Sequence, residues 1–239
     1  MRVIIMGATS GIGQELARMY HKSGHAVGIA GRRLENLKQL SLELSACPYA
    51  QIDITCDDAP KKLQSLTERL GGMDLYLHVS GIGKQNRTLE CDIELATVNT
   101  NVLGFTRMLN HAYHYFAGQR GGHIAVVSSI AGTKGIGVAP SYSATKRFNN
   151  TYIEALEQLA RINGINIAFT DIRPGFVDTD MLSRDFHYPM MMSVDKVASS
   201  IVKGIQKRKR VLTIDWRFRL LVFFWRLLPS SIWVRLRVA

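Results

Sequence analysis

Short apolar runs alternate with longer amphipathic stretches along most of the chain. The runs hold five to eight residues and are mostly apolar on both faces, which is typical of buried parallel strands; they lie at 2–7, 25–30, 48–54, 74–80, 122–129, 165–172 and 211–215. Between them, apolar residues at helical spacing predict helices over 12–23, 34–45, 57–70, 92–117, 143–162 and 194–207.

This alternation predicts an α/β fold, a Rossmann-type, doubly wound parallel sheet of about seven strands with helices on both faces. We expect residues 1–215 to form a single domain and residues 216–239 to form a C-terminal helical tail that is apolar and basic. The apolar opening is too short for a signal peptide. The three cysteines, Cys47, Cys56 and Cys91, form neither a CxxC pair nor a ligand cluster, so we expect a cytoplasmic protein.

The formal net charge of +11 is unevenly distributed. Residues 203–239 hold ten lysines and arginines and a single acid, Asp215, whereas the first 202 residues are nearly balanced. Because the basic residues lie near the C-terminus and not over the whole domain, we expect no nucleic-acid partner. The histidines show no metal-ligand spacing, and we expect no metal site.

The first predicted strand leads into "GATSGIG", in which Gly7, Gly11 and Gly13 have the spacing G-x-x-x-G-x-G. Glycines allow a tight turn and let a pyrophosphate approach backbone N–H groups at a helix N-terminus. A lone glycine pattern can be only a turn, but its place at the start of a βαβ unit favours a dinucleotide site.

The second predicted strand ends in "GIAGRR", without the acid that accepts a hydrogen bond from the ribose 2′-OH of NAD. Arg32 and Arg33 stand there instead, and a guanidinium can pair with a 2′-phosphate. We therefore predict NADP(H), with Arg32 the better candidate. Alternatively, both arginines only begin a solvated helix.

In "PSYSATKRFNN", Tyr142 and Lys146 are four residues apart, on one face of a predicted helix. A free tyrosine has a pKa of about 10, and a cation beside it favours the phenolate. The pair could therefore relay a proton to or from a carbonyl oxygen, although alone it could also be a solvated helix surface.

Over roughly residues 1–215 the chain resembles the short-chain dehydrogenase/reductase family. The resemblance rests on motifs in the family's order: the glycine loop 7–13, "DI" 53–54, "SG" 80–81, "NVLG" 101–104, "SS" 128–129, "YSATK" 142–146 and "RPGFVDTDM" 173–181. Two departures concern the support of the cofactor cleft: Met6 replaces a frequent threonine, and "HVSG" at 78–81 replaces Asn-Asn-Ala-Gly.

The resemblance implies four catalytic residues. Tyr142 would be the general acid in reduction and the general base in oxidation, and Lys146 would lower its pKa and bind the nicotinamide ribose. Ser129 would donate to the substrate oxygen, and Asn101 would hold a water that relays protons to Lys146. We expect Ser128 to be structural.

The resemblance also implies the cofactor contacts. Asp53 would accept from the adenine amino group, unless it only forms a strand-end turn, and Ile54 would pack on the adenine ring. Val177 and Thr179 would fix the carboxamide. The full expected set is Gly7, Thr9, Ser10, Gly11, Ile12, Gly13, Arg32, Arg33, Asp53, Ile54, Ser80, Gly81, Tyr142, Lys146, Pro174, Gly175, Val177 and Thr179.

The segment 181–193 would close over the substrate. Its three methionines at 190–192, with Phe186 and Tyr188, predict an apolar, adaptable wall, or else ordinary core packing. The tail has no apolar run long enough to span a membrane. Its arginines and aromatic residues fit a helix at a membrane surface, a subunit interface, or packing on its own domain.

Together these features predict an NADP(H)-dependent oxidoreductase that interconverts a ketone or aldehyde and an alcohol, acting as a reductase. Its substrate would be apolar, with a lipid-linked compound as one candidate. We expect a homodimer or homotetramer in the cytoplasm, and a tail that binds a membrane surface would place it at the inner face of the membrane. Two alternatives remain open: an epimerase or dehydratase on the same fold, and a protein that binds NADP without turnover.

Overall fold

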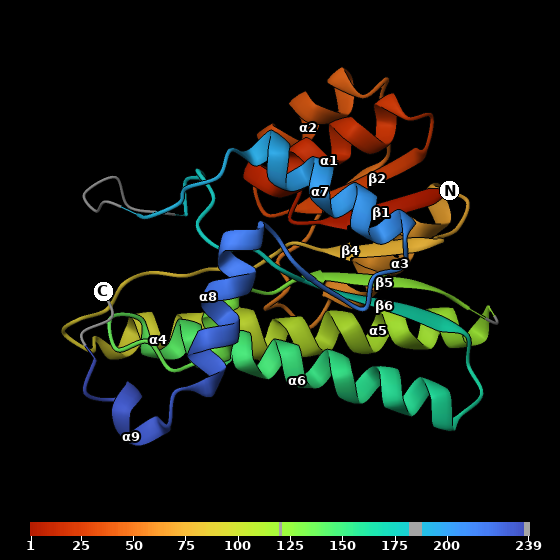
Figure 1. Cartoon of the computed structure of the whole chain (residues 1–239). Helices are drawn as coiled ribbons and strands as arrows, with labels where there is room; N and C mark the ends of the chain where they lie inside the picture. Colours follow the sequence, from red (N-terminus) through yellow and green to blue (C-terminus); the bar gives the residue numbers. More distant parts are fainter. Residues whose placement is uncertain (120, 182–187, 237–239) are drawn as a thin grey trace.

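The computed structural model describes residues 1–119, 121–181 and 188–236. Its centre is a parallel sheet in the order β3-β2-β1-β4-β5-β6-β7 (Figure 1). The strands are β1 (Arg2–Met6), β2 (Ala26–Gly31), β3 (Tyr49–Gln51), β4 (Leu75–His78), β5 (Gly122–Val127), β6 (Ile167–Arg173) and β7 (Val211–Thr213). The doubly wound fold predicted from the apolar pattern is therefore confirmed.

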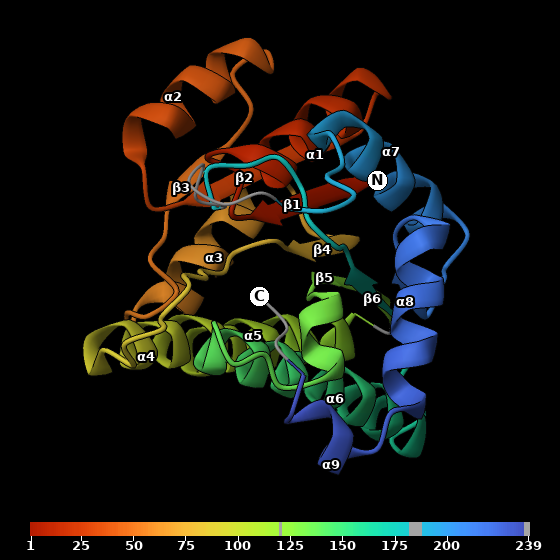
Figure 2. The ribbon, with the colours of Figure 1, turned by 60° about the vertical axis from the view of Figure 1, so that its left-hand side comes forward.

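Helices cover both faces of the sheet (Figure 2). One face packs against α1 (Gly11–Lys22), α2 (Leu34–Glu43) and α7 (Val194–Gln206), and the other against α3 (Ala59–Arg69), α5 (Phe105–Gly118) and α6 (Pro140–Ile162). Strand β1 shows why both faces are apolar: Val3 and Ile5 belong to the first core, and Ile4 and Met6 to the second.

The long helix expected over 92–117 is interrupted. It consists of α4 (Cys91–Val98), a π-helical turn η1 (Asn99–Gly104) and α5. A Cβ on Gly104 would come within 2.9 Å of the Ile54 carbonyl oxygen, so this turn rests directly on the loop after β3. The wide turn places Asn101, a predicted catalytic residue, in the interior of the protein.

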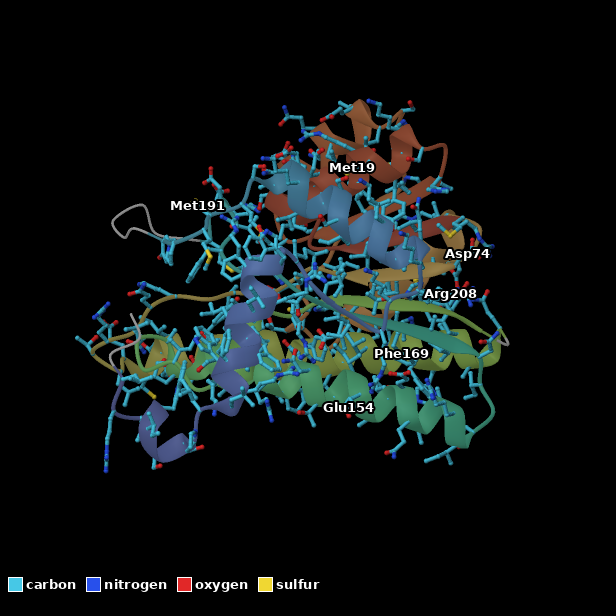
Figure 3. All side chains as sticks on the ribbon, in the orientation of Figure 1. Met19, Asp74, Glu154, Phe169, Met191 and Arg208 are labelled. Carbon is cyan, nitrogen blue, oxygen red and sulfur yellow. The ribbon has the colours of Figure 1, made fainter. Side chains whose placement is uncertain are left out.

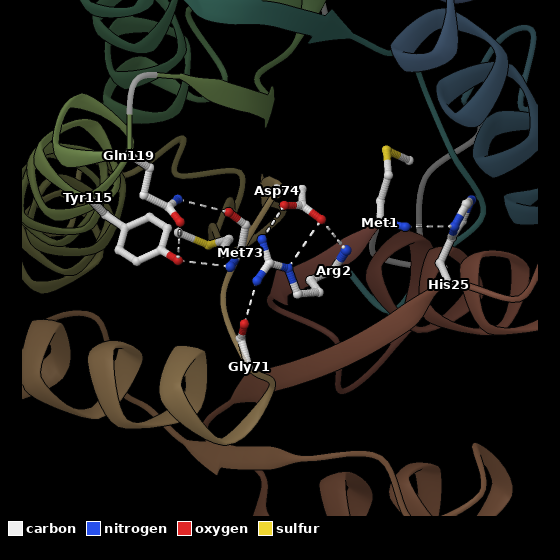
Figure 4. Close-up of polar contacts among 8 residues, drawn as sticks. All are labelled: Met1, Arg2, His25, Gly71, Met73, Asp74, Tyr115 and Gln119. Atoms are coloured by element: carbon white, nitrogen blue, oxygen red, sulfur yellow. Dashed lines mark hydrogen bonds and ion pairs between the residues drawn. The ribbon is translucent and has the colours of Figure 1, made fainter.

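At the amino ends of the strands, side chains tie β1 to β4 (Figure 4). The Arg2 guanidinium pairs with Asp74 at 2.5 Å, and the Tyr115 hydroxyl of α5 accepts from the Met73 backbone N–H. Arg2 and Asp74 also line an open cleft with His123 and Arg208, and Figure 3 labels Asp74 and Arg208 at this edge. This cleft lies at the edge opposite to the glycine loop, which follows the carboxyl end of β1.

After β7 the chain forms α8 (Trp216–Leu227) and a short turn, α9 (Ser230–Trp233). Figure 2 shows α8 along one side of the molecule. Its Phe218 is completely buried, and the Phe218 ring fills the space that a Cβ on Gly175 would need. Lys134 donates to the Leu228 carbonyl, and the Trp233 indole donates to the Gly135 carbonyl at 2.7 Å. The tail thus docks on the segment that follows Ser129.

Within the described ranges, no helix combines the length and apolar character needed to cross a bilayer.

Two phenylalanines of α8 give a matched test of this docking. Phe218→Ala should lower the free energy of unfolding by about 3 kcal/mol, because it empties a buried site. Phe223→Ala, at a position that is 57% exposed, should change it by less than about 0.5 kcal/mol. Urea unfolding measures both values. Equal small losses for the two variants would show that α8 does not pack on the domain.

Candidate active site

The glycine loop lies where the strand order reverses, between β1 and β4, which is where parallel α/β sheets bind ligands. Gly7 has φ +97°, and a Cβ there would lie 2.6 Å from the Ser80 backbone nitrogen. A Cβ on Gly13 would lie 2.1 Å from the Gly7 carbonyl oxygen. No larger residue fits at either position, so the loop stays open and close to the start of α1.

Arg33 reaches back over this loop. Its guanidinium donates to Thr9 Oγ1 at 2.9 Å and to Ser10 Oγ at 2.5 Å, and Asn36 donates to the Thr9 carbonyl. Arg32, which the sequence favours, does not share these contacts. Of the two candidates, Arg33 therefore holds its charge against the loop in the structure.

Asp53 lies after β3. Its Oδ1 accepts from the backbone N–H of Thr55 at 2.9 Å and from the Thr55 hydroxyl at 2.7 Å. Burial raises the pKa of Asp53, but the Thr55 hydrogen bonds and the charge of Arg32 more than offset this effect and lower the pKa below its ordinary value. Asp53 thus forms the strand-end turn, and Ile54 beside it is buried against Gly104.

The predicted catalytic pair lies together on α6. The Lys146 ammonium is 5.7 Å from the centre of the Tyr142 ring and donates to the Val127 carbonyl at 3.2 Å. Lys146 is only 5% exposed. A Cβ on Gly83 would lie 2.5 Å from the Tyr142 ring, so the loop after β4 leaves room for the ring only because residue 83 is glycine.

The pKa of Tyr142 does not shift in the direction that the sequence predicted. Burial lowers the pKa of Lys146 to about 8, although Asp171 opposes this shift. Burial raises the pKa of the Tyr142 phenol, and hydrogen bonding with Ser129 only partly offsets it. The expected lowering of the Tyr142 pKa is therefore absent in the protein chain alone, because desolvation of the phenolate is the larger effect.

Ser128 and Ser129 follow β5 and have different partners. The Ser128 hydroxyl donates to the Asp171 carboxylate and to the Ile172 carbonyl, which ties β5 to β6 as expected for a structural residue. Ser129 begins the short turn η2 (Ile130–Thr133), where its Oγ accepts from the Ala131 N–H at 3.0 Å. The structure thus brings the Ser129 hydroxyl to Tyr142.

Asn101 is held by the loop after β4. Its side chain accepts from the Ile82 N–H at 2.9 Å and donates to the Ile82 carbonyl at 2.7 Å. Two residues that the sequence analysis missed support it: Thr145 Oγ1 accepts from its amide, and Asn149 donates to its carbonyl at 2.9 Å. The buried asparagine run of "KRFNN" in the middle of a helix was the available signal.

The segment after β6 lies beside the glycine loop. Pro174 accepts from the Ile130 N–H, and Thr179 donates to the Val177 carbonyl. A Cβ on Gly11 would lie 3.1 Å from the Thr179 methyl group, so this segment reaches the start of α1. A Cβ on Gly81 would likewise lie close to the side chains of Lys146 and Asn101.

The three methionines have different environments. Met192 is buried in the core, Met190 packs partly against it, and Met191 is exposed. Core packing therefore explains Met192, whereas Met191 is accessible to solvent. The Tyr188 ring packs on Phe176 at 5.0 Å, whereas the predicted wall residue Phe186 lies outside the described residues.

The structure accommodates the two departures from the family pattern, at Met6 and at His78. The Met6 carbonyl accepts from the N–H groups of Val79 and Ser80, so its side chain is free to join the core. His78 is completely buried against Phe105, and burial lowers its pKa to about 3. A neutral imidazole there adds no second charge beside Lys146.

These residues fit a dinucleotide. The open loop of Gly7 and Gly13 can receive a pyrophosphate at the N-terminus of α1. Arg33 adds a positive charge beside that loop, and Lys146, Tyr142 and Ser129 gather at the far end of the same edge.

Known proteins share both the sequence and the fold. The family model described as short chain dehydrogenase matches residues 1–188. An uncharacterized oxidoreductase of Myxococcus xanthus is 29% identical, over 96% of this chain and 93% of that protein. The bovine (Bos taurus) dehydrogenase/reductase SDR family member 7B is 26% identical, over 98% of this chain and 79% of that protein.

Among solved structures, a short-chain dehydrogenase from Sphingobium yanoikuyae in complex with NADPH has a TM-score of 0.81 at 20% identity. It is matched over 100% of this chain and 97% of that chain. A short-chain type dehydrogenase/reductase from Mycobacterium ulcerans also has a TM-score of 0.81, at 22% identity, over 92% of this chain and 90% of that chain.

The depressed pKa of Lys146 has a consequence for stability. Its value in the folded protein, about 8, is below the ordinary 10.5, so the unfolded chain binds the proton more tightly. Stability should rise as the pH increases from 8 to 10.5. Lys146→Met should abolish that rise and stabilise the protein at pH 7 by up to ~3 kcal/mol.

Urea unfolding at pH 7 and pH 10 measures this effect, and Lys22→Met, at an exposed lysine of α1, is the control. If Lys146→Met and the wild type show the same pH dependence, the lysine is not desolvated.

Proposed function

Because the chain belongs to the short-chain dehydrogenase/reductase family, we propose that it is an NADP(H)-dependent oxidoreductase that interconverts a ketone or aldehyde and an alcohol. One observation carries the proposal: Tyr142, Lys146 and Ser129 gather at the same sheet edge as the glycine loop. Bound NADPH would supply the hydride, and the chain's own residues would manage the proton and the negative charge on oxygen.

In reduction, Tyr142 gives its hydroxyl proton to the substrate oxygen. The Ser129 hydroxyl donates a hydrogen bond to the same oxygen and so holds the carbonyl at the phenol. Loss of this proton leaves a phenolate on Tyr142. The Lys146 ammonium, held by the Val127 carbonyl beside the ring, stabilises that charge in an environment of low dielectric constant.

The titration of the pair supports reduction as the working direction. A raised pKa keeps Tyr142 protonated near neutral pH, which a proton donor requires. Below about pH 8, Lys146 is charged and ready to stabilise the phenolate. Asn101, fixed by Ile82 and Thr145, borders Lys146 through Gly81 and would position the group that returns a proton to it.

Two observations support NADP(H) as the cofactor. The compared structure from Sphingobium yanoikuyae was solved with NADPH, and another with a TM-score of 0.78 is an actinorhodin polyketide ketoreductase with NADPH. In this chain, Arg33 stands over the glycine loop, and Arg32 lies near Asp53, where it lowers the carboxyl pKa. We assign the 2′-phosphate chiefly to Arg33, with Arg32 as a second contact.

An apolar substrate is supported by the Phe176–Tyr188 ring pair on the segment that follows Pro174 and Gly175. The homodimer or homotetramer stays a prediction. An epimerase or dehydratase would consume no net cofactor, and a binding protein without turnover would be insensitive to the loss of the Tyr142 hydroxyl. The same assay therefore separates the proposed oxidoreductase from both alternatives.

The test follows NADPH absorbance with a panel of ketones and aldehydes. Tyr142→Phe should bind NADPH as the wild type does and lose activity by about 10²–10⁴-fold, because the proton donor is gone. Tyr152→Phe, on the same helix α6, is the control and should keep its activity. Unimpaired turnover by Tyr142→Phe would refute the assigned chemistry.

Cofactor choice is tested at the two arginines separately. Arg33→Asp should reduce the preference for NADPH over NADH by about tenfold to a hundredfold, since a charge-assisted hydrogen bond to phosphate is lost. Arg32→Asp should reduce it less. The measurement is the ratio of kcat/KM for the two cofactors, and a ratio unchanged in both variants would place the 2′-phosphate elsewhere.

A further inference from the structure

Helix α8 has two apolar faces. Phe218 and Val222 form the face buried against the domain. On the opposite side, five large apolar side chains are between 50 and 65% exposed: Trp216, Leu220, Phe223, Phe224 and Leu227. Their spacing of three and four residues places them along one stripe of the helix. Packing on the domain therefore explains only half of this helix.

Arginines border the exposed stripe. Arg219 and Arg226 are seven residues apart and exposed, so they lie along one edge of it. Arg217, near the other edge, is neutralised by Asp215 at 2.7 Å. Residues 216–239 contain five arginines and no acid. An exposed stripe of tryptophan, phenylalanine and leucine with arginine at its edge is typical of a helix lying in a membrane interface.

In the structure, the basic residues 207–210 lie apart from the arginines of the tail. Residues 207–210 join the end of α7 to the start of β7, at the amino edge of the sheet, and Arg210 pairs there with Glu157. These residues lie at the end of β7 opposite to the one from which α8 starts. Among the residues that the structure describes, Arg219 and Arg226 border the exposed stripe, whereas residues 207–210 lie away from it.

Helix α8 and the turn after it lie next to the candidate active site. The turn η2, which directly follows Ser129, is covered by the tail: Lys134 donates to the Leu228 carbonyl, and Trp233 donates to Gly135. Phe218 lies against Gly175, and the Phe218 ring is 6.2 Å from that of Phe176. A surface that binds the outer face of α8 would therefore be separated from these segments of the candidate site by the tail alone.

We propose that the exposed stripe of α8 docks on an anionic lipid bilayer, and that the carbonyl substrate is an apolar compound taken from that bilayer. The first half stands alone, and the second rests on the proposed function. A second copy of the chain fits the stripe less well, because it would bring together two tails in which every charged side chain is positive. Anionic lipid supplies both the missing charge and the apolar phase.

Vesicle co-sedimentation of the full chain tests the docking. It should bind vesicles of phosphatidylcholine containing phosphatidylglycerol, and bind pure phosphatidylcholine far less. Leu220→Asp/Phe224→Asp should reduce binding by at least about a hundredfold, because two large side chains leave the apolar phase. Arg219→Gln/Arg226→Gln should reduce it by about thirtyfold and remove most of its dependence on salt.

The matched control is Leu42→Asp/Ile162→Asp, which changes two apolar side chains that are 77% and 74% exposed on α2 and α6. It should bind vesicles as the wild type does. Absence of binding by the wild-type chain, or equal losses in the control and the α8 variant, would overturn the proposal. A wild-type oligomer that Leu220→Asp/Phe224→Asp converts to monomer, without vesicle binding, would assign the stripe to a second copy.

The substrate class is tested with two ketones that share a reacting group, one water-soluble and one with a long alkyl chain embedded in anionic vesicles. The α8 variant should lower kcat/KM for the embedded ketone by at least about tenfold, and leave the soluble ketone unchanged, since only delivery is affected. Equal effects on both ketones would overturn the proposal that the substrate is taken from the bilayer. If the wild type reduces neither ketone yet binds vesicles, the proposed function fails and the docking stands.

Discussion

The site depends on one buried positive charge. Lys146 is surrounded by the carbonyl of Val127, the ring of Tyr142 and the loop of Gly81, without a carboxylate in direct ion-pair contact among the described residues. The protein thus maintains a desolvated ammonium, which costs stability, at the place where a phenolate would form. A negative charge on Tyr142 would give that ammonium the partner it lacks, and this attraction would offset part of the cost of desolvating the phenolate.

The fold explains how such a charge is held. The carboxyl ends of β4 and β5 deliver the loop of Gly81 and the turn of Ser129, and α6 brings Tyr142 and Lys146 on one face. Asp171, bonded to Ser128 and paired with Arg173 at 2.6 Å, contributes a distant opposing charge without contacting the ammonium.

Much of this could be read from the sequence. The short apolar runs, most of them apolar on both faces, predicted the strands. The glycine spacing located the loop. Both signals are local in the sequence. Three features depended on tertiary contacts instead. The π-helical turn at Asn101 lies against Ile54, the Arg33 guanidinium reaches the glycine loop through the direction of its side chain, and burial raises the pKa of Tyr142. The support by Thr145 and Asn149 likewise needed the folded chain.

The order in which the two groups of α6 lose their protons tests the account most directly. NMR of ¹³C-labelled lysine Cε and tyrosine Cζ, assigned with Lys146→Met and Tyr142→Phe, follows both in one pH titration. The account predicts that Lys146 titrates first, near pH 8, while Tyr142 stays protonated to a pH above the ordinary tyrosine range. A Tyr142 phenolate that forms while Lys146 is still charged, or a Lys146 midpoint near 10.5, would contradict it.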